Sequence, residues 1–358
     1  MRLAFLDGAR GCACALVIVH HCLFHGHGGE LNNRAWFQIL VANNDGVALV
    51  NLFWAISGFA LACHQGDDAR IVASALARLP RLYFTIMSAV AAFVVATSPE
   101  AGAKETVKRA LWWPLLVWNM MFRSVAIHAD RQLELHFVQL WTFEAEVKGS
   151  FMVYAMCFVV PRVARPRLLV AMVTACASRA STAIAFFGVG FAAQIAHDKL
   201  FGALEAAALG AAVAPTALAF HLAVNAVKAF SVVPPVGWDW MRMAQSFGLL
   251  AAMSCSARTR SVLESRPVQF LGRHSFALYV VHMAFIKQLV GTRAIATPAL
   301  FMVVVAGCSV TTALALTRVD RAVIAASKRF AEWMMRVDAQ RPPEEEAPAE
   351  TEELLVIK

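Results

Sequence analysis

Long apolar runs alternate with short polar segments along most of the chain, and many of these runs have the length of a membrane-spanning helix. An α-helix rises about 1.5 Å per residue, so roughly 20 apolar residues cross a hydrocarbon core about 30 Å thick. Ten runs are predicted to span the membrane: 11–24, 46–63, 82–97, 146–161, 168–178, 180–196, 203–224, 244–256, 275–290 and 296–317. The pattern predicts an all-α fold, a polytopic membrane helix bundle of about ten transmembrane helices.

An eleventh run, residues 110–122, is short and contains three tryptophans and a proline, which is typical of an interfacial or re-entrant segment. Cytoplasmic loops are enriched in Lys and Arg, so the basic clusters test whether this run crosses. If it does not cross, all clusters lie on the side of the N-terminus; if it crosses, three move outside. The clusters are Arg2/Arg10, Arg70/Arg78/Arg81, Arg162/Arg165/Arg167, Arg258/Arg260/Arg266/Arg273 and the segment from Arg318. We therefore predict a multi-pass protein of the plasma membrane or an endomembrane with both termini in the cytoplasm.

The chain is predicted to consist of one membrane domain, residues 1–317, and two C-terminal pieces. Residues 318–341 combine basic side chains with apolar ones such as Phe330 and Trp333, a pattern that favours a basic amphipathic helix on the inner leaflet. Residues 342–358 form an acidic, proline-containing tail that we expect to be disordered. No second soluble domain and no internal repeat is recognisable.

Composition agrees with a membrane protein and narrows its function. Hydrophobic residues make up 59% of the 358 residues, charged residues 16%, and the mean hydropathy is +0.60, which leaves too little polar surface to coat a soluble globule. The net charge of +8 lies in short clusters between apolar runs, so no nucleic-acid partner is expected. The eight cysteines include no Cys-x-x-Cys pair and are interpreted as small core residues; no metal site or bound cofactor is predicted.

Two adjacent histidines, His20 and His21, lie deep in the first apolar run, and Arg10 directly precedes this run. Arg10 and His21 would be roughly 16 Å apart along a helix, so only the arginine can stay at the headgroups. An imidazole at this depth either joins two helices by a hydrogen bond or belongs to a site. Histidine is the natural general base because its ordinary pKa is about 6.5. The two rings point about 100° apart, so only one need face the site, and the sequence leaves open which.

Glu146, at the outer end of the fourth predicted span, is the candidate partner of the catalytic histidine. Its neighbours Glu144 and Lys148 have a structural explanation, since their spacing of four residues favours an ion pair on the helix surface. Glu146 lies off that face and deeper in the span. It is therefore the carboxylate that we expect inside the bundle.

Three further segments contain candidate site residues, and two of them place polar groups at helical spacing. The Ser-Gly-Phe sequence at 57–59 would let two helices approach closely, because glycine has no side chain. Arg78 and Arg81 share a helix face at the cytoplasmic end of the third span, where they either follow the positive-inside rule or bind phosphate. Tyr279 and His282 also share a face, either as a satisfied polar pair or as part of a site.

Taken in order, four segments resemble the membrane acyltransferase-3 family, especially its eukaryotic, fungal-type members, over most of the chain. They are Leu6-Asp7-Gly8-Ala9-Arg10-Gly11 with His20-His21, Asn51 to Phe59, Leu140 to Ser150, and Phe270 to His282. The basic segment departs from the family pattern, with Ala77 in place of an arginine and Phe84 in place of a proline. Glu144-Ala145 replaces the more usual Pro-Val, which leaves Glu146 in register.

The resemblance implies an integral-membrane O-acyltransferase that moves an acyl group, commonly acetyl, from acyl-CoA to a hydroxyl of a carbohydrate, a lipid or another small molecule. Acyl-CoA is then a co-substrate that arrives from the cytoplasm. We expect His21, or its neighbour His20, to take the proton of the attacking hydroxyl, and Glu146 to orient the ring. Residues expected to bind the substrates or the oxyanion are Arg10, Ser57, Arg78, Arg81, Tyr279 and His282.

Two alternatives come from other functional classes. A polytopic transporter would use His21, Glu146 and His282 as a proton relay, but the spans show no inverted repeat and the chain is short. A catalytically silent membrane scaffold is the other alternative. The acceptor, the acyl chain length and the oligomeric state are left open by the sequence.

Overall fold

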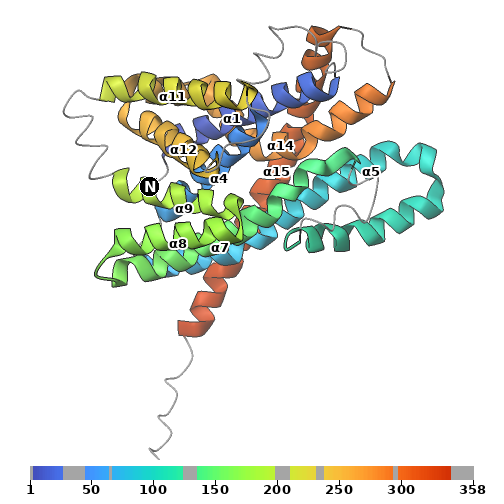
Figure 1. Ribbon diagram of the computed structural model, residues 1–358. Helices are drawn as coiled ribbons and strands as arrows, with labels where there is room; N and C mark the ends of the chain where they lie inside the picture. Colours follow the sequence, from blue (N-terminus) through green and yellow to red (C-terminus); the bar gives the residue numbers. More distant parts are fainter. Residues whose placement is uncertain are drawn as a thin grey trace, which may run out of the picture.

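The computed structural model describes residues 3–26, 45–63, 67–123, 135–197, 210–230, 238–292 and 297–339, and every regular element within them is helical (Figure 1). The predicted all-α fold is therefore confirmed. The α-helices are α1 (Ala4–His21), α4 (Gly46–Ala62), α5 (Asp68–Met120), α7 (Thr142–Val159), α8 (Pro166–Ala180), α9 (Thr182–Ala196), α11 (Gly210–Phe230), α12 (Trp238–Cys255), α13 (Ala257–Leu263), α14 (Arg266–Thr292) and α15 (Pro298–Ala339). Short helical turns are η1 (Cys22–Gly26), η3 (Val138–Trp141) and η4 (Val160–Arg162).

Each predicted span overlaps one of these helices, as expected for a membrane helix bundle. By length and apolar composition, three described segments can cross a membrane: Ala4–His25, Asp68–Val94 and Pro298–Met334. Shorter apolar helices are Gly46–Ala62, Thr182–Ala196 and Ala212–Asn225. The total of ten crossings and the side of each terminus stay predictions.

Helix α5 folds back on itself (Figure 1). The Tyr83 hydroxyl donates a hydrogen bond to the carbonyl of Pro114, at 3.4 Å, and the Tyr83 ring contacts that of Trp118, with 5.6 Å between centroids. A straight helix would separate Tyr83 and Pro114 by roughly 46 Å. The run 110–122, predicted to be interfacial or re-entrant, therefore packs against the first half of α5; whether it crosses the membrane stays a prediction.

Helix α15 runs without a break from the last predicted span into the predicted amphipathic segment, and its end projects away from the bundle (Figure 1). The boundary predicted at 317/318 is thus not a helix end. Phe330 and Trp333 are more than half exposed, as an amphipathic face requires, but its placement on a leaflet stays a prediction. The predicted acidic tail, 342–358, lies outside the described residues.

Helices α1 and α14 are parallel and share one register. Gly11 lies against the backbone of Leu271 and Gly272, and the Cys14 thiol donates a hydrogen bond to the carbonyl of Ser275 at 3.3 Å. Gly11 and Gly272 are 261 positions apart in the sequence (272 − 11), and Cys14 and Ser275 are separated by the same 261 positions. A constant separation is what two parallel helices in one register produce. Because Gly11 and Gly272 lack side chains, the two backbones touch at this point.

Helices α4 and α9 also meet through glycines. A side chain at Gly58 would overlap the backbone of Phe187, and one at Gly190 would overlap the backbone of Ala55. This confirms the close helix packing predicted for segment 57–59. The contact holds α4 so that Ser57 is buried inside the bundle, with 6% of its surface exposed.

The glycine contact between α1 and α14 can be tested by substitution. A methyl group at Gly272 would overlap the backbone of Asp7, which cannot move away as a flexible side chain would. We expect Gly272→Ala to lower the free energy of unfolding by about 1–3 kcal/mol. The measurement is the thermal unfolding midpoint of the purified protein in detergent.

Gly307→Ala is the matched control, because a methyl group at Gly307 in α15 meets nothing within 4 Å. Alanine stabilises an exposed helix position by about 0.5–1 kcal/mol relative to glycine, so this variant should unfold at the same temperature or higher. Equal midpoints for Gly272→Ala and the wild type would contradict the backbone contact.

Candidate active site

One cavity of about 110 Å³ brings together residues of α1, α4, α5, α7 and α14; we call it the arginine cavity. Phe53, Trp54 and Phe276 form part of its apolar wall. Six of the site residues predicted from the sequence line it: Arg10, Ser57, Arg78, Arg81, Glu146 and Tyr279. Residues from widely separated segments therefore share one small polar space inside an apolar bundle.

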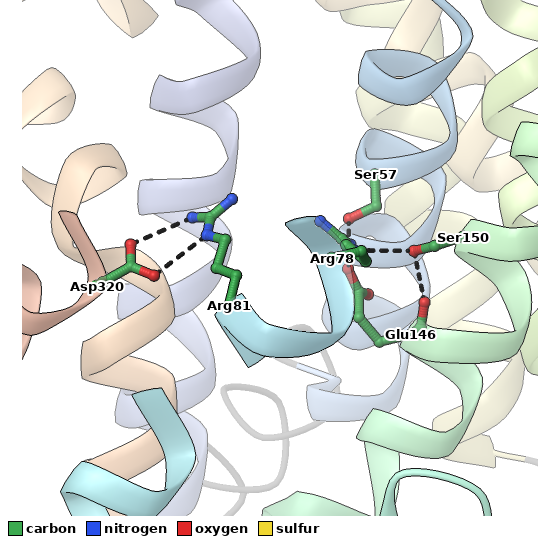
Figure 2. A network of polar contacts seen from close by, with 6 residues as sticks. All are labelled: Ser57, Arg78, Arg81, Glu146, Ser150 and Asp320. Atoms are coloured by element: carbon green, nitrogen blue, oxygen red, sulfur yellow. Dashed lines mark hydrogen bonds and ion pairs between the residues drawn. The ribbon is translucent and has the colours of Figure 1, made fainter. Parts of the chain in front are cut away.

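Glu146 is held by an arginine and two serines (Figure 2). The guanidinium of Arg78 forms an ion pair with the Glu146 carboxylate, and its Nε donates to the Ser150 hydroxyl at 3.1 Å. The Ser57 hydroxyl donates to the same carboxylate at 3.3 Å. Only 13% of the Arg78 side chain and 18% of that of Glu146 are exposed, so each charge depends on the other for compensation.

Arg81 faces a second carboxylate, that of Asp320 on α15 (Figure 2). Its Nε and Nη2 donate to the two carboxylate oxygens at 3.1 and 3.3 Å, and the Thr85 hydroxyl donates to the first of these at 3.1 Å. This geometry is bidentate, and it suits arginine because the planar guanidinium can donate two parallel hydrogen bonds to one carboxylate. Arg10, by contrast, has a looser partner, Asp7, whose carboxylate is 3.7 Å away. Arg10 is therefore the least neutralised of the three guanidiniums.

A second cavity, of about 550 Å³, contains the histidines of α1 and η1; we call it the histidine cavity. His20, His21 and His25 line it together with Gln139 and Lys287. Val50 and Tyr279 line both cavities, so the two spaces adjoin at these side chains.

The partner of His21 is His282. The Nδ1 atom of His21 and the Nε2 atom of His282 are 2.9 Å apart, and the two rings are nearly parallel, with 5.2 Å between centroids. The expected contact between His21 and Glu146 is not formed among the described residues, and this corrects our prediction. The physical reason is that Glu146 on α7 faces the full positive charge of Arg78, a stronger partner for a carboxylate than an imidazole.

His282 also differs from its predicted role. We expected it to bind substrate, but it is fully buried and lines neither cavity. Its Nδ1 atom lies 2.7 Å from the carbonyl oxygen of Tyr279, and its Nε2 atom faces His21. Both ring nitrogens are thus occupied by protein groups.

His20 also lines the histidine cavity, but its ring has other neighbours than that of His21. Its ring fills the space where Gly46 has no side chain, at the start of α4, and it stacks on Phe24 with 6.1 Å between centroids. His20 and His21 share the cavity, and it is His21 whose ring bonds to α14.

Ser57 and Tyr279, the two hydroxyl-bearing residues among those expected to bind the substrates or the oxyanion, have protein partners in this structure. The Tyr279 hydroxyl lies 3.3 Å from Oγ1 of Thr142 and 3.5 Å from the carbonyl of Gln139. That of Ser57 donates to Glu146. Their role in catalysis stays a prediction.

Sequence reasoning missed three residues that line the histidine cavity, His25, Gln139 and Lys287, and one, Asp320, that pairs with a residue of the arginine cavity. Lys287 lies 3.2 Å from Nδ1 of His25 beside the histidine cavity, Gln139 donates to the carbonyl of Val280 at 2.5 Å, and Asp320 pairs with Arg81. Lys287 carried a usable signal, since a charge inside the apolar run 275–290 needs a reason. His25 and Asp320 lie just beyond predicted spans, where polar residues are ordinary.

The predicted ion pair between Glu144 and Lys148 is present on the surface of α7. Among the described residues, no group of three or more His, Cys, Asp and Glu side chains is arranged to hold a metal ion.

The family described as the acyltransferase domain, acyltransferase-3, matches residues 3–318. This chain belongs to that family. The matched segment contains every residue that lines either cavity, while Asp320 lies two positions beyond it. The protein is therefore an acyltransferase with membrane-type helices, and the transporter alternative gains no support. No curated protein and no solved structure matches the chain.

The ion pair between Arg78 and Glu146 makes a prediction for stability. Glu146→Gln would leave a mostly buried guanidinium without its counter-charge, and we expect a loss of about 3 kcal/mol in the free energy of unfolding. Chemical denaturation in detergent measures this loss.

Glu144→Gln on the same helix is the control, because its partner Lys148 is 45% exposed and such surface pairs contribute about 0–1 kcal/mol. Equal free energies of unfolding for the two amide variants would contradict a large contribution of the Arg78–Glu146 ion pair to stability.

Proposed function

We propose that this acyltransferase moves an acyl group, acetyl being the expected one, from acyl-CoA to a hydroxyl of a carbohydrate, lipid or other small-molecule acceptor. The observation that carries the proposal is the junction of two cavities at Tyr279 and Val50, one lined by three arginines and the other by a histidine cluster. A transfer reaction needs two substrates to meet, and the junction is where they would do so.

The arginine cavity suits the donor. Coenzyme A carries several phosphate charges, and guanidinium groups bind phosphate with paired hydrogen bonds. Arg10 is best placed for this, since its carboxylate partner is 3.7 Å away, whereas Arg78 and Arg81 would have to exchange closer carboxylates for phosphate. At about 110 Å³ the cavity is smaller than a typical ligand site, so it would hold only the part of coenzyme A that its arginines contact.

The histidine cavity suits the acceptor. Its volume of about 550 Å³ lies within the usual range of small-molecule sites. His21, on its wall, would take the proton of the acceptor hydroxyl while the oxygen attacks the thioester carbonyl. The new C–O bond forms, the C–S bond breaks, and the proton passes from His21 to the departing thiolate. Donor and acceptor would thus approach the junction from two sides.

Release of free coenzyme A tests the reaction. Purified protein in nanodiscs is given acetyl-CoA and a panel of sugar, glycerolipid and small alcohol acceptors. We expect acceptor-dependent release that falls by about 10²–10⁴-fold in His21→Ala, because the general base is lost.

His274→Ala is the matched control, since His274 is a buried histidine that contacts Thr317 on α15 and lines neither cavity. This variant should release coenzyme A at nearly the wild-type rate. Wild-type turnover by His21→Ala would overturn the assignment of the base.

The role of Arg10 is tested separately by its effect on donor affinity. One charge-assisted hydrogen bond contributes about 1.5–3 kcal/mol, so Arg10→Gln should raise the KM for acyl-CoA by about 10–100-fold. The kcat at saturating donor should change little, because Arg10 lies in the cavity without His21. An unchanged KM would exclude Arg10 from donor binding.

A further inference from the structure

The hydrogen bonds of the histidine pair determine which nitrogen of each ring carries a proton. The carbonyl oxygen of Tyr279 can only accept, so the Nδ1 atom of His282, 2.7 Å away, must be the donor. A neutral imidazole has one N–H group. The Nε2 atom of neutral His282 is therefore an acceptor.

The same reasoning extends to His21. Its Nδ1 atom lies 2.9 Å from the Nε2 acceptor of His282, so Nδ1 of His21 must carry the proton and donate it. The Nε2 atom of neutral His21 is then the nitrogen with a free lone pair. Among the described residues no group donates a hydrogen bond to it, and His21 lines the histidine cavity.

We propose that His282 is a positioning residue that holds His21 in the tautomer whose Nε2 atom acts as the base. This inference rests on the proposed function of His21. In many enzymes a carboxylate orients the catalytic imidazole in this way. Here a second, neutral imidazole, itself oriented by the backbone of α14, takes that place, and Glu146 is free to neutralise Arg78.

The arrangement also determines where the proton goes. When His21 takes a proton on Nε2, its Nδ1–H bond to His282 becomes charge-assisted and stronger. The proton cannot travel further along α14, because the chain of hydrogen bonds ends at the Tyr279 carbonyl, which has no proton to release. The proton on Nε2 therefore returns to the cavity side, where the departing thiolate would receive it.

Paired substitutions at position 282 test the proposal through kinetics. His282→Phe keeps a buried ring but removes the acceptor for His21, whereas His282→Gln offers an amide oxygen in its place. We expect kcat to fall by about 10–100-fold in His282→Phe with the KM for acyl-CoA unchanged, and His282→Gln to recover most of the loss.

His274→Phe on the same helix is the control, since this residue is also buried and bonds to Thr317 instead of to His21. It should keep the wild-type kcat. Wild-type turnover by His282→Phe, or equal loss in the Phe and Gln variants, would overturn the positioning role while leaving His21 as the base.

A second measurement does not depend on activity or on a variant that folds poorly. Nuclear magnetic resonance of wild-type protein with ¹⁵N-labelled histidine, near neutral pH, distinguishes protonated from unprotonated ring nitrogens. We expect protonated Nδ1 atoms in both His21 and His282 and an unprotonated Nε2 in His21. A protonated Nε2 in His21 would overturn the proposal, whereas absence of coenzyme A release with every acceptor would count against the proposed function alone.

Discussion

The backbone contact between α1 and α14 is the constraint on which both cavities depend. The two helices are parallel, and they touch where Gly11 meets Gly272. Ten residues further along each helix, about 15 Å away, His21 meets His282 at the same separation of 261 positions. One glycine contact thus fixes the register that brings the two imidazoles together.

The second constraint is the compensation of charge inside an apolar bundle. Removing a guanidinium from water costs several kcal/mol unless an anion with good geometry faces it. Arg78 and Arg81 lie three residues apart on α5, yet they are bound to different helices, one to Glu146 on α7 and the other to Asp320 on α15. The two ion pairs therefore join α5 to two other helices (Figure 2). Both arginines also line the arginine cavity.

Much of the fold could be predicted from local pattern. Apolar length predicts the helices, the missing side chain of Gly58 predicts a close contact, and the spacing of Glu144 and Lys148 predicts their ion pair. These features depend on neighbours in sequence or on a single residue type. The same reasoning predicts some of the residues that line the cavities, because ionisable groups in apolar runs gather inside the bundle.

The contacts between side chains within the site could not be predicted from local sequence pattern. The sequence shows that His21 and Glu146 are both polar and deep, but not which helix face each presents or how helices from opposite ends of the chain align. The bond between His21 and His282 depends on that alignment, and the doubling back of α5 depends on contacts between its own two halves. Side-chain partners of this kind become visible only when the rotation and register of each helix are known.

The position of Asp320 has a consequence for what counts as one structural unit. The recognised acyltransferase region ends at residue 318, whereas the carboxylate that balances Arg81 stands at 320, on the same unbroken helix. A fragment cut at the end of the recognised region would contain every residue that lines the cavities, yet it would carry an uncompensated cation in the wall of one. The limits of a domain drawn from sequence similarity and the limits of its electrostatic balance therefore do not coincide in this protein.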